Sequence, residues 1–262
     1  MPRVPSTLLA VLLLLFTIPA PGGARPAVPD SGPWEAGEGV ARAEANAVRE
    51  STDRALAALS RHATRTSHPG ALRLAFQAYF RYAAAATAEV RNPYFFFVDY
   101  GLDNRTPRGW VFDIKALELV EGPFTVAHGS GSSDRRNGVP TRFSNRPGSY
   151  MTSLGLFLAQ ETYRFSGKSG GRRYTSVGLR LRGLSGSFND AARRRGIVSH
   201  GAPYVSRTDA GRSQGCPAME QVRARRLLPK LAGGGLVFLY SPRHEDWLRQ
   251  GPWVASRTVV AR

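Results

Sequence analysis

The chain has 262 residues, of which 36 are Lys or Arg and 19 are Asp or Glu, so its formal net charge at pH 7 is +17. Hydrophobic residues make up 42% of the sequence and aromatic residues 10%, which is enough for a buried core and excludes a fully disordered chain. The single cysteine, Cys216, excludes an intramolecular disulfide framework and a multi-cysteine zinc module. We expect one basic globular domain, with or without a helical preface, that carries an unpaired thiol.

Residues 1–24 have the layout of a secretory signal peptide. Arg3 supplies a positive charge, an apolar run follows over residues 8–18, and Gly22 and Ala24 offer small residues at the cleavage positions. The run is shorter than the about 20 apolar residues of a membrane span, and prolines close it. We therefore expect export to the periplasm, the cell wall or the extracellular space, with no transmembrane anchor after cleavage.

The remaining chain divides by composition and by hydrophobic period. Residues 25–40 are rich in Pro, Gly and acidic residues and predict a linker. Residues 41–90 predict a preface of two amphipathic helices, the second over about 72–90. Apolar or small residues mark the first helix at the helical spacing: Ala45, Val48, Thr52, Ala55 and Leu59. Residues 91–245 predict the main domain and 246–262 a C-terminal tail.

From residue 94 onward the pattern is that of strands. Residues 94–100, 110–114, 124–128, 176–181, 196–199 and 236–240 predict short strands, and 189–195 and 219–231 predict brief helices. Many short strands between Gly and Pro turns, with few long helices, predict a mainly β sandwich or barrel.

The excess of positive charge favours an acidic partner without naming it. Nucleic acid is not expected, because the export signal argues against it and no zinc-finger, helix-turn-helix or RNA-binding pattern is present. Anionic envelope polymers, or a lipid surface, fit the charge better. Arginine greatly outnumbers lysine, which occurs only at Lys115, Lys168 and Lys230. A compositional bias would produce the same excess, so the charge has little weight in choosing a function.

Cys216 is a candidate nucleophile. An isolated cysteine is often a small core residue, but Gly215 before it permits close backbone approach and Pro217 after it removes a backbone donor. A thiolate needs a nearby base or cation to form near neutral pH. His200 is the obvious base, since it ends a strand-like run beside Gly201 and can face a cleft.

Other polar residues have two interpretations each. His128 is a second candidate histidine, although a structural histidine bonded to backbone is the better-supported interpretation. Arg212 either binds a carboxylate through its planar guanidinium or is a solvated loop residue. Tyr204 and Ser199 are candidates for lining the cleft. We expect no metal site, because His200 and Cys216 lack a third and fourth ligand, and no cofactor.

Together these residues resemble the murein L,D-transpeptidase catalytic-domain family, in its exported bacterial subgroup. The family signature is a His-Gly pair followed by a Ser-x-Gly-Cys block. It is matched here by His200-Gly201 and by Ser213-Gln214-Gly215-Cys216-Pro217-Ala218, in which Cys216 lies sixteen residues after His200. Three further segments are similar to that subgroup: Val126-Ala127-His128-Gly129 with Gly131-Ser132, Phe143-Ser144-Asn145, and Asn189-Asp190-Ala191 before Arg195. Many members have His before the Gly-Cys pair and Arg or Asn two places after the cysteine, where this chain has Gln214 and Ala218.

The resemblance implies an L,D-transpeptidase-like catalytic domain over residues 91–245 and a cysteine mechanism on peptidoglycan stem peptides. Cys216 would attack the carbonyl of the third stem residue and expel the terminal D-alanine, with His200 as proton acceptor and the Gly201 carbonyl orienting its ring. Backbone N–H groups of Gln214, Gly215 and Cys216 would hold the oxyanion. Ser213, Arg212, Tyr204 and His128 complete the expected substrate-binding set.

Alternative functions remain open at this point. An amine acceptor from a second stem would give a 3→3 crosslink, whereas water would make the protein an L,D-carboxypeptidase. A catalytically idle, basic wall-binding protein and a different thiol hydrolase of envelope peptides are the other two candidates.

Overall fold

The computed structural model describes residues 33–135 and 137–253, and the residues from Val40 onward form one compact unit. The helices are α1 (Pro33–Leu59), α2 (Ala71–Ala85), α3 (Gln221–Leu231) and α4 (Glu245–Gln250). The strands are β1 (Tyr94–Asp99), β2 (Gly109–Asp113), β3 (Glu118–Phe124), β4 (His128–Gly129), β5 (Gly155–Ser169), β6 (Arg172–Gly183), β7 (Val198–Ala202), β8 (Arg212–Ser213), β9 (Ala218–Glu220) and β10 (Leu236–Tyr240).

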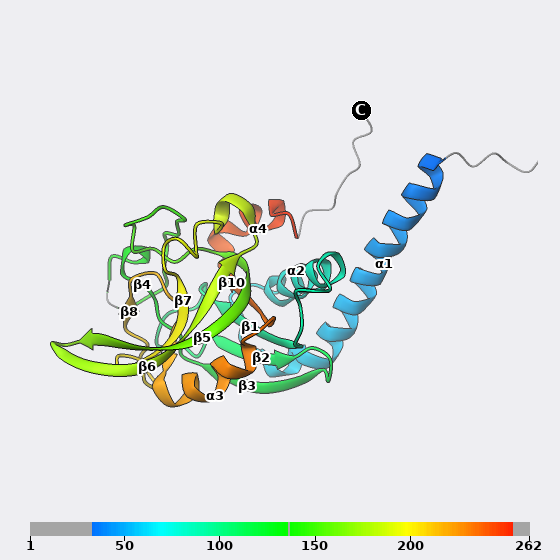
Figure 1. The fold of residues 1–262 in the computed structure, drawn as a ribbon. Coiled ribbons are helices and arrows are strands. Elements are labelled where there is room, and N and C mark those ends of the chain that lie inside the picture. Colours follow the sequence, from blue (N-terminus) through cyan, green and yellow to red (C-terminus); the bar gives the residue numbers. More distant parts are fainter. Residues whose placement is uncertain (1–32, 136, 254–262) are drawn as a thin grey trace, which may run out of the picture. The chain divides into compact units, whose positions relative to one another are not determined.

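The fold is mainly β, which confirms the predicted class. Eight strands form one mixed sheet in the order β3-β2-β1-β10-β5-β6-β7-β9, and β4 pairs with β8 in a separate two-stranded sheet (Figure 1). Two of the neighbouring pairs in the large sheet are parallel, β1 with β10 and β7 with β9. The second of these pairs brings together two segments that the sequence analysis marked as functional.

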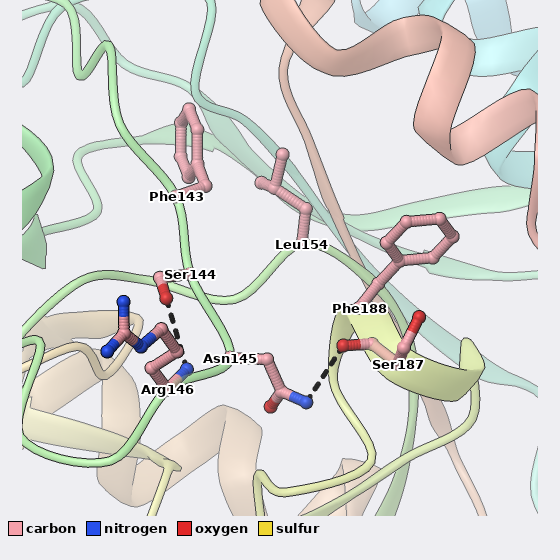
Figure 2. A pocket seen from close by; sticks show the side chains of 7 residues that line it. All are labelled: Phe143, Ser144, Asn145, Arg146, Leu154, Ser187 and Phe188. Carbon is pink, nitrogen blue, oxygen red and sulfur yellow. Dashed lines mark hydrogen bonds between the residues drawn. The ribbon is translucent and has the colours of Figure 1, made fainter.

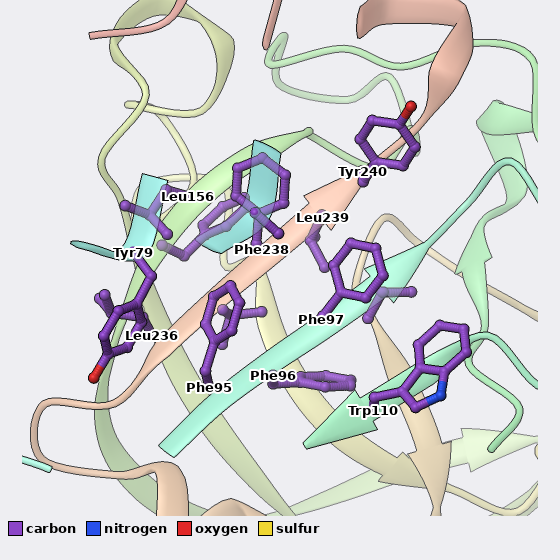
Figure 3. Packing of buried hydrophobic residues seen from close by; sticks show 14 of the residues in the cluster. Tyr79, Phe95, Phe96, Phe97, Trp110, Leu156, Leu236, Phe238, Leu239 and Tyr240 are labelled. Atoms are coloured by element: carbon purple, nitrogen blue, oxygen red, sulfur yellow. The ribbon is translucent and has the colours of Figure 1, made fainter. Parts of the chain in front are cut away.

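The centre of the large sheet is buried on both faces because its strands are continuously apolar. β1 and β10 pair in register from Phe95 with Leu236 onward, and every residue of β10 is buried (Figure 3). On one face Phe95 packs against Phe76 of α2, with ring centroids 6.0 Å apart. Neighbouring residues of a strand face opposite ways. Phe96 accordingly packs on the other side against Phe124, whose ring lies under the guanidinium of Arg223 from α3. The sheet is thus covered by α2 on one face and α3 on the other.

Several predicted elements lie close to their observed places. The strands predicted at 94–100, 110–114 and 236–240 correspond to β1, β2 and β10, and the helix predicted at 219–231 corresponds to α3. The two N-terminal helices also occur, but α1 begins at Pro33, inside the range predicted as linker, and α2 ends at Ala85 rather than near 90. The signal peptide predicted at 1–24 lies outside the described residues, as do the first half of the linker and the end of the tail.

The strand predicted at 124–128 is interrupted rather than continuous. β3 ends at Phe124, and pairing resumes only at Ala127, which bridges to Ala218, and at His128, which begins β4. The carbonyl of Val126 accepts two bonds from the buried Arg108 guanidinium, at 2.9 and 2.7 Å. The carbonyl of Ala127 accepts one from the Tyr100 hydroxyl at 3.0 Å. In the gap between the two strands a buried arginine, rather than a neighbouring strand, satisfies the backbone.

The helix predicted at 189–195 was also wrong, since this segment forms turns. The Asn189 side chain accepts a bond from the Ser185 N–H at 2.8 Å and donates one to the Leu156 carbonyl at 2.8 Å. These contacts hold the segment against β5 and favour turns over a continuous helix. β5 was not predicted, although its fifteen residues make it the longest strand among the described residues.

Candidate active site

The parallel pairing of β7 with β9 places the two candidate catalytic residues on adjacent segments. His200 is in register with Ala218, two residues beyond Cys216. The carbonyl of Pro217, which follows Cys216, accepts bonds from the Ser199 hydroxyl at 3.2 Å and from the His200 N–H at 3.3 Å. The backbone beside Cys216 is therefore fixed against the backbone of His200.

The Cys216 thiol is half-buried and lies in a mixed electrostatic environment. Its Sγ donates a long hydrogen bond to the Gly196 carbonyl, at 3.9 Å. Burial raises the pKa of the Cys216 thiol, while a backbone hydrogen bond from Val198 and the charge of Arg195 oppose that rise. Because burial has the larger effect, the neutral thiol is favoured in the free protein, and reaction as a thiolate requires a proton acceptor.

The Gly201 carbonyl holds one nitrogen of the His200 ring. Its side chain is buried, and Nδ1 lies 3.1 Å from the Gly201 carbonyl oxygen. A carbonyl can only accept, so the proton is assigned to Nδ1 and Nε2 is left with its lone pair. Burial lowers the pKa of His200, against the effect of the Gly201 bond, and keeps the ring neutral. The ring also packs edge-on against Phe165, at 5.5 Å between centroids.

The turn before Cys216 is closed by Ser213. Its hydroxyl donates to the Cys216 carbonyl at 2.7 Å and accepts from the Gly215 N–H at 3.1 Å. Gly215 has φ +120°, and a Cβ there would lie 3.0 Å from both the Met151 carbonyl oxygen and Ile197 Cδ1. The turn therefore requires glycine at this position. Of the three N–H groups expected to hold an oxyanion, that of Gly215 is already bonded to Ser213, whereas Gln214 is exposed.

The two-stranded sheet brings a second part of the predicted set close to the turn. His128 and Gly129 of β4 pair with Arg212 and Ser213 of β8. A Cβ on Gly129 would collide with the Tyr150 carbonyl and lie 2.8 Å from the Gly215 Cα, so the β4 backbone touches the turn before Cys216. The Arg212 guanidinium donates to the Ser133 carbonyl at 3.2 Å.

His128 is buried and paired with an arginine rather than with backbone. Arg108 Nη2 lies 2.8 Å from His128 Nδ1, and since a guanidinium can only donate, Nδ1 is the acceptor and Nε2 carries the proton. His128 Nε2 finds no hydrogen-bond partner among the described residues. Burial, then the charges of Arg108 and Arg212, lower the pKa of His128 to about 3. His128 is a neutral donor at physiological pH and cannot act as a base through Nδ1.

Arg195 is a residue of this site that was not predicted as a functional residue. Its guanidinium donates four hydrogen bonds, all to the segment 144–153: to the Ser144 carbonyl (2.7 Å), the Ser153 hydroxyl (2.5 Å), the Ser149 hydroxyl (3.1 Å) and the Met151 carbonyl (2.8 Å). Arg195 thus fixes the Met151 carbonyl that packs against Gly215. In the sequence, Arg195 could have been noticed because it directly precedes Gly196 and the strand-like run that ends at His200. In the structure, the Gly196 carbonyl accepts a hydrogen bond from the Cys216 thiol.

The hairpin of β5 and β6 adds aromatic residues that were not predicted either. Tyr163 and Tyr174 each lie over the glycine directly opposite, since a Cβ on Gly178 or Gly167 would meet their rings. Burial raises the pKa of Tyr163, Tyr174 and Tyr204, and the charge of a Cys216 thiolate would add to that rise in each. Tyr204 was predicted, and its ring lies 6.4 Å from that of His200.

A cavity of about 430 Å³ lies beside this site rather than at Cys216 or His200 (Figure 2). It is lined by Phe143, Ser144, Asn145, Arg146, Leu154, Ser187 and Phe188. Asn145 bridges two segments that the sequence analysis noted separately, donating to the Ser187 carbonyl at 2.9 Å and to Asp190 Oδ1 at 2.7 Å. Arg195 links the two regions, because it bonds the carbonyl of Ser144, which lines the cavity, and the carbonyl of Met151, which packs against Gly215.

The described ranges, 33–135 and 137–253, contain no group of three or more His, Cys, Asp or Glu residues that could hold a metal ion. They also contain no helix that is long and apolar enough to cross a membrane.

Residues 64–240 match the model of a protein family described as the L,D-transpeptidase catalytic domain. The chain belongs to this family. The match covers more than half of the sequence, runs from just before α2 to the end of β10, and includes both His200 and Cys216. Membership of the L,D-transpeptidase catalytic domain family confirms the resemblance seen in the sequence and supports a transpeptidase-type function.

Solved structures of L,D-transpeptidases are similar to the chain at low identity. One from Mycobacterium smegmatis is 13% identical with a TM-score of 0.36, and the match covers 56% of this chain and 58% of that one. One from Stackebrandtia nassauensis is 14% identical with a TM-score of 0.34, covering 65% and 68%. One from Mycobacterium tuberculosis is 14% identical with a TM-score of 0.31, covering 56% and 57%. No curated protein matches the chain.

Proposed function

We propose that the protein is an exported, cysteine-dependent L,D-transpeptidase that acts on peptidoglycan stem peptides. The observation that carries the proposal is the arrangement of His200 and Cys216 on paired segments, with the Gly201 carbonyl holding His200 Nδ1 so that Nε2 is the basic nitrogen. The family match supports the same assignment. The signal-peptide layout of residues 1–24 supports export.

The proposed reaction has two halves that share one thioester. In the first, His200 Nε2 takes the thiol proton, and the Cys216 sulfur forms a bond to the carbonyl carbon of the third stem residue. The bond to the terminal D-alanine breaks, and its amine leaves with the proton from His200. In the second half, the side-chain amine of another stem attacks the thioester, giving a 3→3 crosslink and restoring the thiol. Attack by water instead would give the L,D-carboxypeptidase outcome.

The environment of Cys216 suits this sequence of proton transfers. A thiol whose pKa is raised by burial stays protonated until a substrate and a base are in place, so it is protected from adventitious oxidation. Developing negative charge on the carbonyl oxygen would be held by the backbone N–H groups near Gln214 and Cys216, an effect commonly worth about 3 kcal/mol per donor. Arg212 and Tyr204 are proposed to contact the stem peptide.

The experiment is muropeptide mass spectrometry after incubating the purified protein with tetrapeptide stems. We expect crosslinked or trimmed products with the wild type, none with Cys216→Ala, and a loss of about 10²–10⁴-fold with His200→Gln. His62→Gln is the matched control, since His62 lies on the segment before α2, and it should retain wild-type activity. Products from Cys216→Ala would refute the thiol mechanism.

A second measurement separates an active enzyme from an idle wall-binding protein. Because Cys216 is the only cysteine, a carbapenem-type β-lactam that acylates the protein at a thiolate must do so there. We expect intact mass to rise by one adduct in the wild type and not in Cys216→Ala. An unmodified wild-type protein that still binds peptidoglycan would favour the idle protein.

A further inference from the structure

The outer part of the β5–β6 hairpin has two chemically different faces. The strands extend past the rest of the sheet to a turn at Gly170 and Gly171 (Figure 1), which have φ +54° and +77°. Alternate residues of a strand face opposite sides. Tyr163, Phe165 and Tyr174 therefore share the face that meets His200.

The opposite face carries positive charge and hydroxyl groups. It consists of Arg164, Ser166 and Lys168 on β5 and of Arg173 and Thr175 on β6, all of them exposed. Lys168 and Arg173 are direct cross-strand partners, as are Ser166 and Thr175. Arg172, opposite Ser169, belongs by the same alternation to the other face, but it is exposed at the turn beside this group. We call Arg164, Lys168 and Arg173, with the two hydroxyls and with Arg172 at the adjoining turn, the basic face.

The basic face has no internal counter-charge. The sequence contains no Asp or Glu from residue 162 to residue 189. Further down the hairpin the arginines are paired, Arg180 with Glu161 and Arg182 with Glu89. Within the described ranges, by contrast, none of the four cations of the basic face makes an ion pair or a side-chain hydrogen bond. If the positive charge reflected only the arginine-rich composition, we would expect carboxylates to pair with these cations, as Glu161 and Glu89 pair with Arg180 and Arg182.

We infer that the basic face binds an extended polymer that carries phosphate groups. Arg164 and Lys168 are four residues apart on one strand, a separation of about 13 Å, whereas Lys168 and Arg173 lie about 5 Å apart across the strands. Four cations over that length match anionic groups repeated every few ångströms, as in a phosphate polymer. Guanidinium groups bind phosphate oxygens in pairs, and the Ser166 and Thr175 hydroxyls add donors between them.

A membrane surface fits this face less well. Proteins that lie on a bilayer combine positive charge with apolar side chains that enter the lipid. On this side of the hairpin Val177, opposite Arg164, is apolar, but it is half-buried and packs against the core, and the exposed residues from there to the turn are polar or charged. A hydrophilic polyanion is therefore the partner. The other face of the same hairpin contacts His200, so a bound polymer would lie next to the candidate active site without requiring its activity.

The experiment is a titration of the full chain with long-chain inorganic polyphosphate at several salt concentrations. Each phosphate neutralised on a flexible single-stranded polyanion contributes about 0.7 to the slope of log K against log salt. Replacing Arg164, Lys168, Arg172 and Arg173 by Gln should therefore make this negative slope less steep by about 3, and it should weaken binding strongly at low salt. The rate of alkylation of Cys216 should stay unchanged, which shows that the variant is folded.

The control removes the same charge elsewhere. Arg42, Arg54, Arg65 and Arg225 are exposed arginines, and their fourfold change to Gln alters the net charge equally. We expect this control to lose little of the affinity. An equal loss in both variants would mean that the charge acts diffusely, and the proposal would be wrong. Equal affinity for polyglutamate, or binding to anionic phospholipid vesicles but not to polyphosphate, would also overturn it.

Discussion

At the scale of single residues, the site is organised around a thiol that its surroundings keep neutral. The Gly196 carbonyl accepts a hydrogen bond from the Cys216 thiol, and burial raises the pKa of that thiol. Burial likewise lowers the pKa of His200, so the free site holds an uncharged pair rather than a thiolate and an imidazolium. Arg195 is the one cation whose charge opposes the rise at Cys216.

Replacement of Arg195 should move the pH at which Cys216 becomes reactive. Because the guanidinium stabilises the thiolate, Arg195→Met should raise the midpoint of iodoacetamide alkylation by about one pH unit, and Arg195→Lys should shift it less. The rate is followed by intact mass, and the single cysteine makes the assignment unambiguous.

The direction of that shift distinguishes charge from packing. Loss of the four bonds to the segment 144–153 would open the site, reduce the burial of the thiol and lower its pKa. A downward shift would therefore assign Arg195 a purely structural role. Arg193→Met is the control, since Arg193 is an exposed neighbour that pairs with Glu161, and its midpoint should stay in place.

At the scale of elements, a buried carboxylate attaches the segment between α1 and α2 to the central sheet. Asp99, the last residue of β1, accepts bonds from the Ser67 N–H and hydroxyl, both at 2.6 Å, and from the Gly101 N–H at 2.9 Å. Gly101 is required beside it, because a Cβ there would overlap the Ser67 hydroxyl. The attachment fixes the start of α2 relative to β1.

Asp99→Asn should destabilise the protein by about 1–3 kcal/mol. An amide can offer only one oxygen, so at least one buried donor loses its acceptor. Urea unfolding measures the free energy of unfolding. Asp53→Asn removes an exposed carboxylate, 53% accessible and paired with Arg73, and should cost less than about 1 kcal/mol. Equal losses in the free energy of unfolding from the two changes would show that the hydrogen bonds of Asp99 stabilise the protein no more than an exposed ion pair does.

Elements of this kind explain which parts of the fold could be predicted from the sequence. β1, β2 and β10 were predicted because a strand buried on both faces is a short apolar run. β5 was missed because its outer half leaves the core and alternates polar with half-buried residues. The pair Gly170-Gly171 was the available signal, since two consecutive positive φ values are typical of a two-residue hairpin turn.

The same reasoning separates the predictable from the unpredictable part of the site. His200, Gly201 and the turn from Ser213 to Cys216 are contiguous in sequence, so a motif can reveal them. Arg195 acts through long-range contacts with carbonyls of the segment 144–153, and no local pattern encodes which carbonyls those are. Arg108 was overlooked for the same reason, because an arginine is mostly exposed unless the fold supplies buried acceptors.

At the scale of the whole molecule, Arg108 and His128 connect the two sheets. Arg108 precedes β2 of the large sheet and is fully buried, and its guanidinium donates to the Leu102 and Val126 carbonyls as well as to His128 on β4. Burial lowers the pKa of Arg108 to about 10, which still leaves it charged at neutral pH. A charged arginine inside the protein requires a neutral histidine beside it.

This pair should make the stability of the protein fall in acid. The pKa of His128 is about 3 in the folded protein and about 6.5 when unfolded, so the unfolded chain binds the extra proton between these values. Stability present above pH 6.5 is thus lost as pH falls toward 3, by up to about 4 kcal/mol from this residue.

In His128→Gln the amide oxygen can still accept from Arg108 but cannot titrate. Urea unfolding at a series of pH values should show the variant less stable than the wild type at pH 7, and this difference should shrink or reverse by pH 4. A constant difference across that range would mean that His128 does not stay neutral in the folded protein.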